Sequence, residues 1–137
     1  MRLVLDATAA VRMVMRAEDA DDLLTSIGTA TVVAAPSLYA SEIANALWKY
    51  VKAGRLDADT ALERFEEAVN LIDEFTSDSG LATEALTEAV RYGHPVYDLL
   101  YAVLARRTGC VVLTLDRRLD ALLGNMGISS ATENRNR

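Results

Sequence analysis

Cysteine is nearly absent from this sequence. Cys110 is the single one among 137 residues, so neither an internal disulfide nor a cluster of thiolate metal ligands can form. Because Cys110 begins an apolar run, we interpret it as a small buried hydrophobe without chemistry of its own.

Long hydrophobic runs are absent as well. No apolar run approaches the roughly 20 residues that a membrane-spanning helix needs. The N-terminal run at residues 3–5 stops at Asp6, which does not fit a secretory signal. We therefore expect a protein that works in the cytoplasm and has no membrane segment.

Basic residues are fewer than acidic ones in this sequence. There are 14 Lys and Arg against 20 Asp and Glu, which gives a formal net charge of −6. A protein that coats nucleic acid non-specifically needs many cationic contacts to phosphate, so this class is excluded, whereas a local binding site is not. Several basic residues fall near the acidic positions discussed below, although each one alone is typical of a solvated helix face: Arg12, Arg16, Lys49, Lys52, Arg117 and Arg118.

Motifs of several enzyme classes are missing. The one histidine, His94, precedes Pro95 and is interpreted as a turn or cap residue, which argues against a Ser-His-Asp hydrolase and a histidine-driven ribonuclease. No P-loop sequence occurs. A haloacid-dehalogenase-type phosphatase would need a second Asp where Thr8 stands, and the acceptor Asp and Lys of a receiver domain are also lacking.

Apolar residues make up 51% of the chain, enough to bury the core of one domain. We predict that residues 1–130 form this domain and that residues 131–137 are a polar tail. The strands are predicted at residues 2–5, 31–35, 71–75 and 111–115, with an edge strand near Ile128. The helices are predicted at residues 7–16, 20–27, 38–53, 56–70, 78–92, 95–108 and 116–123.

The alternation of strands and helices determines the expected fold class. Connections of this length are too long for hairpins, so the strands should pair in parallel and be covered by helices on both faces. We expect an α/β three-layer sandwich with a central, mostly parallel sheet of four to five strands. Ser37 and Asp57 are predicted helix caps, and Pro95 is predicted as the first residue of its helix.

Two acidic residues directly follow predicted strands. Asp6 ends the first strand and Asp116 follows the strand at residues 111–115. Because ligands of such sheets gather at the carboxyl ends of the strands, both side chains should lie at the functional edge. The alternative is that each simply caps the helix that follows it.

Asp98 lies in a helix that is apolar on nearly every face, between Val96 and Leu104. A buried carboxylate costs several kcal/mol unless it is paired, so Asp98 should face a cation, a partner or a cleft. The alternative is a surface Asp stabilised by the helix dipole in the first turn after Pro95.

Glu42 lies about one turn into its helix, away from the apolar stripe. A solvated glutamate is the ordinary interpretation, but a position near the helix N-terminus also puts Glu42 within reach of the other acids. Asp120 is interpreted as a solvated acid. Thr8 and Thr114 either hydrogen-bond a carboxylate or a metal-bound water, or pack in the turn and strand.

A cluster of four carboxylates calls for a cation. Two like charges about 4 Å apart repel by roughly 4 kcal/mol at an effective dielectric constant of about 20. Ligands that are all oxygen favour magnesium, with manganese as a substitute, over zinc.

Four segments of the sequence resemble the motifs of the PIN-domain ribonucleases, and most closely those of VapC-like toxins. They are residues 3–8, residues 35–47, residues 97–101 and residues 114–119, in this order. Ala7 stands where the family often has a hydroxyl residue. The resemblance implies metal-dependent endonucleolytic cleavage of RNA, a homodimer, and inhibition by a small antitoxin that inserts residues toward the acidic pocket.

The resulting hypothesis is a metal-dependent endoribonuclease with Asp6, Glu42, Asp98 and Asp116 as catalytic residues. The metal would be held by Asp6, Asp98 and Asp116, while Glu42 would orient water or support the ligands. Whether one or two ions take part stays open. The alternative function is a catalytically inactive PIN-fold domain that binds a partner. Trp48 and Tyr39 are expected either to form a partner groove or a dimer contact, or to pack in the core.

Overall fold

The computed structural model describes residues 1–131. The predicted polar tail therefore lies outside the described residues, except for its first residue, Ala131, which is buried.

The described residues form one sheet of four parallel strands in the order β3-β2-β1-β4. Leu3 at the centre of the sheet is paired with Val33 on one side and Val111 on the other. Both neighbours run parallel to β1 because a helix separates each strand from the next along the chain. The strands are β1 (Arg2–Leu5), β2 (Val32–Pro36), β3 (Glu74–Thr76) and β4 (Val111–Leu113).

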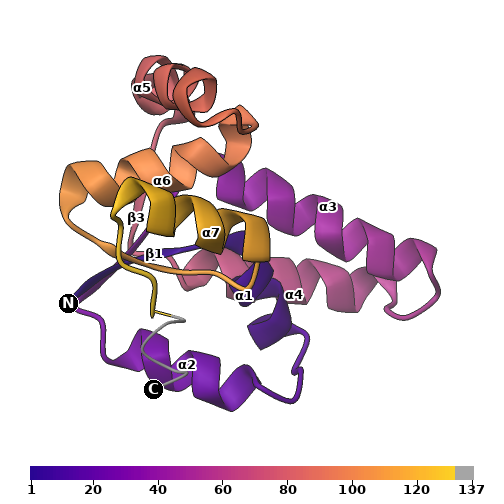
Figure 1. Cartoon of the computed structure of the whole chain (residues 1–137). Coiled ribbons are helices and arrows are strands. Elements are labelled where there is room, and N and C mark those ends of the chain that lie inside the picture. Colours follow the sequence, from indigo (N-terminus) through magenta and orange to yellow (C-terminus); the bar gives the residue numbers. More distant parts are fainter. Residues whose placement is uncertain (132–137) are drawn as a thin grey trace.

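Helices cover both faces of this sheet, which confirms the predicted three-layer α/β fold. Helix α6 packs on β1, β2 and β4, and α5 packs on α6. In Figure 1, α5 and α6 lie above the strands, and α1 and α2 lie below them. The helices are α1 (Ala7–Val14), α2 (Ala20–Gly28), α3 (Leu38–Lys52), α4 (Ala58–Asn70), α5 (Asp78–Tyr92), α6 (Val96–Thr108) and α7 (Arg117–Met126).

The predicted fifth strand near Ile128 is wrong within the described residues. This segment forms an isolated parallel bridge between Val112 and Ser130, and the Val112 amide donates to the carbonyl of Ser129 at 3.0 Å. The third strand begins at Glu74, later than predicted. Residue Asp73, just before it, pairs with Val33 through its backbone amide at 2.8 Å and its carboxylate at 2.9 Å.

The N-terminus of α3 is capped differently from the prediction. The Ser37 side chain makes no capping hydrogen bond and donates instead to the carbonyl of Thr76 at 3.2 Å. The amide of Leu38 donates to the carboxylate of Asp78 at 3.0 Å, so the cap comes from the first residue of α5. Sequence position alone favours Ser37, because a cap donated across the fold leaves no local signal.

The other predicted helix ends vary in outcome. Asp57 caps α4 as predicted and accepts from the amide of Thr60 at 2.8 Å. Pro95 takes the N-cap position with ψ 142°, so α6 begins at Val96 rather than at the proline. Gly109 ends α6 with φ +68°, a left-handed conformation that side chains disfavour.

The core contains the largest fully buried side chains, Tyr39 and Tyr101. Tyr39 therefore packs in the core, where its hydroxyl donates to the carbonyl of Ala68 at 2.6 Å. Trp48 is 55% exposed and belongs to the surface. Cys110 is buried, as predicted.

Candidate active site

Asp6 joins β1 to α1 and is buried, with 4% of its surface exposed. It occupies the N-cap position of α1 but makes no side-chain capping hydrogen bond. Its Oδ2 atom instead accepts hydrogen bonds from the hydroxyls of Thr8 and Thr114, each at 2.6 Å. The alternative of a helix cap therefore fails for Asp6, whose carboxylate is oriented by two threonines.

These threonines tie together the ends of two neighbouring strands. The amide of Leu115 donates to Thr8 Oγ1 and the amide of Asp116 donates to Thr114 Oγ1, both at 3.0 Å. Each hydroxyl thus accepts from the backbone after β4 and donates to the carboxylate after β1. This exchange explains why β4 ends at Leu113, two residues before the predicted end.

Asp116 follows β4 and is half-buried. Its Oδ1 atom caps α7 by accepting from the amides of Arg118 at 2.8 Å and Leu119 at 3.3 Å. The alternative interpretation thus holds for this residue without removing it from the site, because the charge of Asp116 raises the pKa values of Asp6 and Asp98.

Glu42 comes from the second turn of α3 and is held from the opposite layer. The Tyr101 hydroxyl on α6 donates to Glu42 Oε1 at 2.6 Å. Burial raises the pKa of Glu42 to about 7; the Tyr101 hydrogen bond opposes this rise, and the charges of Asp6 and Asp98 add to it.

Asp98 lies in the first turn of α6, with 25% of its side chain exposed. Burial and the charge of Asp116 raise its pKa, and His94 lowers it. His94 Nε2 lies 3.4 Å from Asp98 Oδ2, without hydrogen-bond geometry. Asp98 was expected to face a cation, a partner or a cleft, and His94 is only a weak partner for it.

Sequence reasoning missed Tyr101 as a contact of Glu42 and His94 as a neighbour of Asp98. Both face the site from α6 or the turn before it, at helical spacing from Asp98. A tyrosine in an otherwise apolar helix was an available signal, since a buried hydroxyl needs a partner. Asp120 was expected to be a solvated acid, and this expectation is wrong for one of its oxygens. Its Oδ1 atom is buried and has no hydrogen-bond partner among the described residues.

The structure brings all four predicted carboxylates into mutual electrostatic range, since the pKa of Glu42 responds to Asp6, Asp98 and Asp116. Over residues 1–131, however, no three His, Cys, Asp or Glu side chains are already close enough to hold one metal ion. The donors fit a hard divalent cation chemically, because all are carboxylate oxygens whose repulsion a cation would relieve. Their side chains would have to draw closer around it.

A cavity of about 620 Å³ opens beside Glu42, the one of the four carboxylates that lines it. Its lining includes Thr8 and Glu42 from the site, together with the basic side chains of Arg12, Lys49 and Arg55. Glu42 is therefore accessible from the side of α1 and α3.

A family model described as the PIN domain matches residues 3–123. The chain belongs to the PIN domain family. This assignment confirms the resemblance seen in the four sequence motifs.

Relatives of this PIN domain include ribonuclease VapC3 of Pyrobaculum aerophilum, which is 32% identical over 121 residues, covering 87% of this chain and 92% of the relative. The crystal structure of PAE2754 from the same organism has 29% identity and a TM-score of 0.71, and the match covers 89% of this chain and 79% of that one. VapBC2 from Rickettsia felis, bound to a DNA fragment from their promoter, has 15% identity and a TM-score of 0.62, with 85% and 88% covered. The last likeness concerns the fold alone.

No helix in the described part of this PIN domain is long and apolar enough to cross a membrane.

Proposed function

We propose that this PIN domain is a metal-dependent endoribonuclease and the toxin of a toxin–antitoxin pair in the cytoplasm. The observation that supports this function is the convergence of four carboxylates whose charges act on one another. The similarity to a ribonuclease over most of both chains agrees with it. An inactive partner-binding domain would have no need to keep so repulsive a cluster.

In this proposal Asp6, Asp98 and Asp116 hold Mg²⁺, for which Mn²⁺ can substitute. A bound divalent ion supplies a water of lowered pKa and offsets negative charge on the phosphate. Thr8 and Thr114 fix the orientation of the Asp6 carboxylate.

Glu42 has a separate part in the proposed reaction. Its carboxyl group would orient the attacking water and accept a hydrogen bond from it. The Tyr101 hydroxyl donates a hydrogen bond to Glu42 Oε1 and so restrains the Glu42 side chain.

The proposed regulator is a small antitoxin protein, which the resemblance of the four sequence motifs to those of VapC-like toxins implies. Residues of the antitoxin would enter the acidic pocket and block access to the carboxylates. A cationic side chain suits this place, because it would relieve the repulsion that the metal otherwise relieves.

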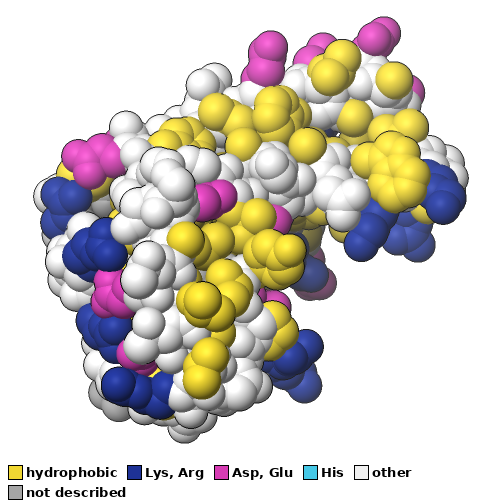
Figure 2. All heavy atoms as spheres, turned by 90° about the horizontal axis from the view of Figure 1, so that it is seen from above, with side chains coloured by type: hydrophobic (Ala, Val, Ile, Leu, Met, Phe, Trp, Pro, Cys, Tyr) yellow, Lys and Arg dark blue, Asp and Glu magenta, His cyan; other side chains and the backbone are white. Residues whose placement is uncertain are grey.

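In this proposal the PIN domain acts as a homodimer. Helix α5 exposes Leu86 by 58% and Val90 by 77%, one turn apart on the same helix face. Figure 2 views the molecule from above, the side on which α5 lies in Figure 1, and shows hydrophobic side chains gathered on that side of the molecule. A second copy covering α5 would remove these side chains from water.

Cleavage assays with Asp98→Asn test the enzymatic proposal. Wild type should cleave a panel of structured and single-stranded RNAs, and a closed circular RNA, with Mg²⁺ or Mn²⁺ but not with EDTA. Asp98→Asn should lose about 100-fold or more in rate, because one charged ligand is gone. Asp59→Asn makes the same chemical change on the exposed side of α4 and should cleave like wild type.

The assay distinguishes the alternatives directly. Equal cleavage by wild type and Asp98→Asn would identify a contaminant as the nuclease. Cleavage of linear but not circular RNA would contradict endonucleolytic action. Absence of cleavage by wild type with every ion would favour the inactive partner-binding domain.

A further inference from the structure

The cavity beside Glu42 is a groove between two helices that both begin at the carboxyl edge of the sheet. Residues of α1 line one side and residues of α3 line the other, and the two helices pack together. The groove starts at Thr8 and Glu42 and continues past the end of α3 to Arg55. We call it the α1–α3 groove.

The α3 side of the groove is a single helical stripe. Glu42, Asn45 and Lys49 lie at positions i, i+3 and i+7, and all three line the cavity. Lys49 therefore lies about 10 Å along the helix axis from Glu42, at roughly 1.5 Å per residue. The stripe leads from the candidate catalytic residue Glu42 to positively charged side chains.

The charge of the groove is opposite to that of the whole chain. Arg12, Lys49 and Arg55 line it, and Glu42 is the one acid among its described lining residues, although the chain has a formal net charge of −6. Arg12 is bound to Asp19 at 2.9 Å. Lys49 and Arg55 form no ion pair with any described residue. Two cations are thus available to an anionic ligand.

The interior of the groove has less polar surfaces. Val11, Ala46 and Ala53 contribute small apolar side chains, and the half-buried Tyr50 presents an aromatic ring. Aromatic rings next to cationic side chains are the elements with which proteins bind single-stranded nucleic acid, through base stacking and phosphate contacts. A cavity of about 620 Å³ is of the size that holds a small ligand or a short piece of chain.

We propose that the α1–α3 groove binds the single-stranded RNA chain that flanks the scissile phosphate, with phosphates at Lys49 and Arg55 and a base against Tyr50. The inference rests on the proposed ribonuclease function and adds the path of its substrate. The groove compensates locally for the acidic net charge, which would otherwise repel RNA. Lys49, Tyr50 and Arg55 are positioning residues in this scheme and take no part in the chemistry.

Binding measurements separate the groove from catalysis. In the Asp98→Asn background, which prevents cleavage, the affinity for a short fluorescein-labelled single-stranded RNA is followed by anisotropy at several salt concentrations. Adding Lys49→Ala/Arg55→Ala should raise Kd about tenfold and reduce the slope of log K against log salt by about 1.4, since each phosphate contact to a single strand contributes roughly 0.7. Lys49→Arg should restore most of the affinity lost in Lys49→Ala.

A matched control removes the same charges elsewhere. Lys52 lies over the Trp48 ring at 5.1 Å and Arg91 lies on α5, and neither lines the groove. Lys52→Ala/Arg91→Ala should leave Kd and the salt slope near the parent values. Equal losses in the two double variants would overturn the inference, because net charge alone would then explain binding.

Kinetics provide an independent readout in the protein with Asp98 intact. Lys49→Ala/Arg55→Ala should raise KM for RNA about tenfold while kcat stays within about threefold. Tyr50→Ala should weaken binding about tenfold, whereas Tyr50→Phe, which keeps the ring, should bind like the parent. A fall in kcat at unchanged KM, or a groove that binds a protein while RNA parameters stay the same, would overturn the proposed RNA path.

The outcomes also distinguish this inference from the proposed function. If wild type cleaves RNA with Mg²⁺ but the groove variants bind RNA like the control, the RNA path alone fails. If wild type cleaves nothing but binding depends on Lys49 and Arg55, the ribonuclease function fails and the groove remains an RNA-binding site.

Discussion

At the scale of single residues, the candidate active site is held in a repulsive arrangement by hydrogen bonds. Two threonine hydroxyls orient Asp6 and one tyrosine hydroxyl restrains Glu42. For both acids burial is the largest cause of a raised pKa, and these hydrogen bonds work against it. The metal-free site is thus electrostatically strained, and a strained site responds measurably when one charge is removed.

Asp98→Asn in the metal-free protein should melt at the same temperature as wild type or higher. The pKa of Asp98 is raised by burial and by Asp116, so its ionised form is less favourable in the folded than in the unfolded state. The stability cost is absent below the unfolded pKa and appears as pH rises through the folded pKa. Asparagine removes this cost, so its advantage should be largest at pH 7 to 8 and disappear toward pH 4.

Differential scanning calorimetry with EDTA at several pH values measures this effect. Asp59→Asn, on an exposed part of α4, is the control and should follow wild type at every pH. A clearly lower melting temperature for Asp98→Asn at pH 7 would instead show that the contact with His94, at 3.4 Å, has structural importance.

The positions of Asp6 and Asp116 after strands were predicted from the sequence, and the structure confirms these positions because the local pattern of apolar residues shows where a strand ends. Their roles as metal ligands stay a prediction. The same reasoning could not identify Tyr101 as the partner of Glu42, because the two residues are 59 positions apart and belong to α3 and α6, which both contact β2. Contacts of this kind depend on tertiary structure, and local patterns contain no trace of them.

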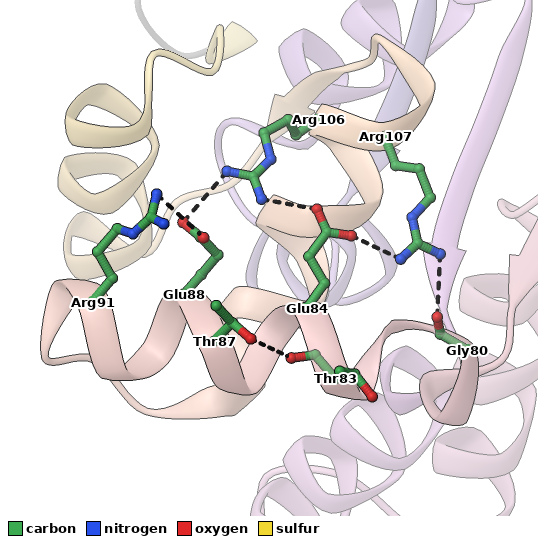
Figure 3. Close-up of polar contacts among 8 residues, drawn as sticks. All are labelled: Gly80, Thr83, Glu84, Thr87, Glu88, Arg91, Arg106 and Arg107. Atoms are coloured by element: carbon green, nitrogen blue, oxygen red, sulfur yellow. Dashed lines mark hydrogen bonds and ion pairs between the residues drawn. The ribbon is translucent and has the colours of Figure 1, made fainter.

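At the scale of elements, α5 and α6 are joined by an ion-pair network, drawn in Figure 3. Arg106 and Arg107 both bind Glu84, at 2.8 Å and 2.7 Å. Glu88 has 5% of its side chain exposed and lies 3.4 Å from Arg106 and 3.6 Å from Arg91. Because α6 also carries Asp98, this network helps to fix the helix that presents a candidate metal ligand.

Glu88→Gln should lower the free energy of unfolding by about 1 to 3 kcal/mol, because a buried carboxylate that faces two guanidinium groups is replaced by a neutral amide. Urea denaturation followed by circular dichroism gives this value. Glu66→Gln on the exposed side of α4 makes the same change without a buried partner and should alter stability by less than about 0.5 kcal/mol. Equal effects of both substitutions would mean that the network does not stabilise the α5–α6 pair.

Element boundaries illustrate how far local sequence reasoning extends. Helix α6 ends at Thr108 as predicted, because Gly109 after it adopts the left-handed conformation, which favours glycine. The cap of α3 was predicted wrongly, because Asp78 reaches Leu38 from another element. The parallel sheet was predictable from the lengths of the connections. The same argument could not exclude the strand predicted near Ile128, where the described residues form only an isolated bridge.

At the scale of the whole molecule, the outer face of α5 is the feature that a monomer explains least. Leu86 and Val90 are far more exposed than the apolar residues on the inner face of the same helix, such as Leu81 and Ala85, which are fully buried. The α1–α3 groove is built from other helices, so a second copy on α5 leaves the proposed RNA path open.

Sedimentation velocity should find wild type as a dimer and Leu86→Lys/Val90→Glu as a monomer. The two new charges leave the net charge unchanged and face each other at i and i+4, so α5 itself should keep its helix content by circular dichroism. A stable dimer covers about 800 Å² on each partner, and charges placed at its centre would have to be buried there. Leu62→Lys, at a position 66% exposed on α4, should remain a dimer. A monomeric wild type would contradict the homodimer, whereas a double variant that still dimerises would move the interface away from α5.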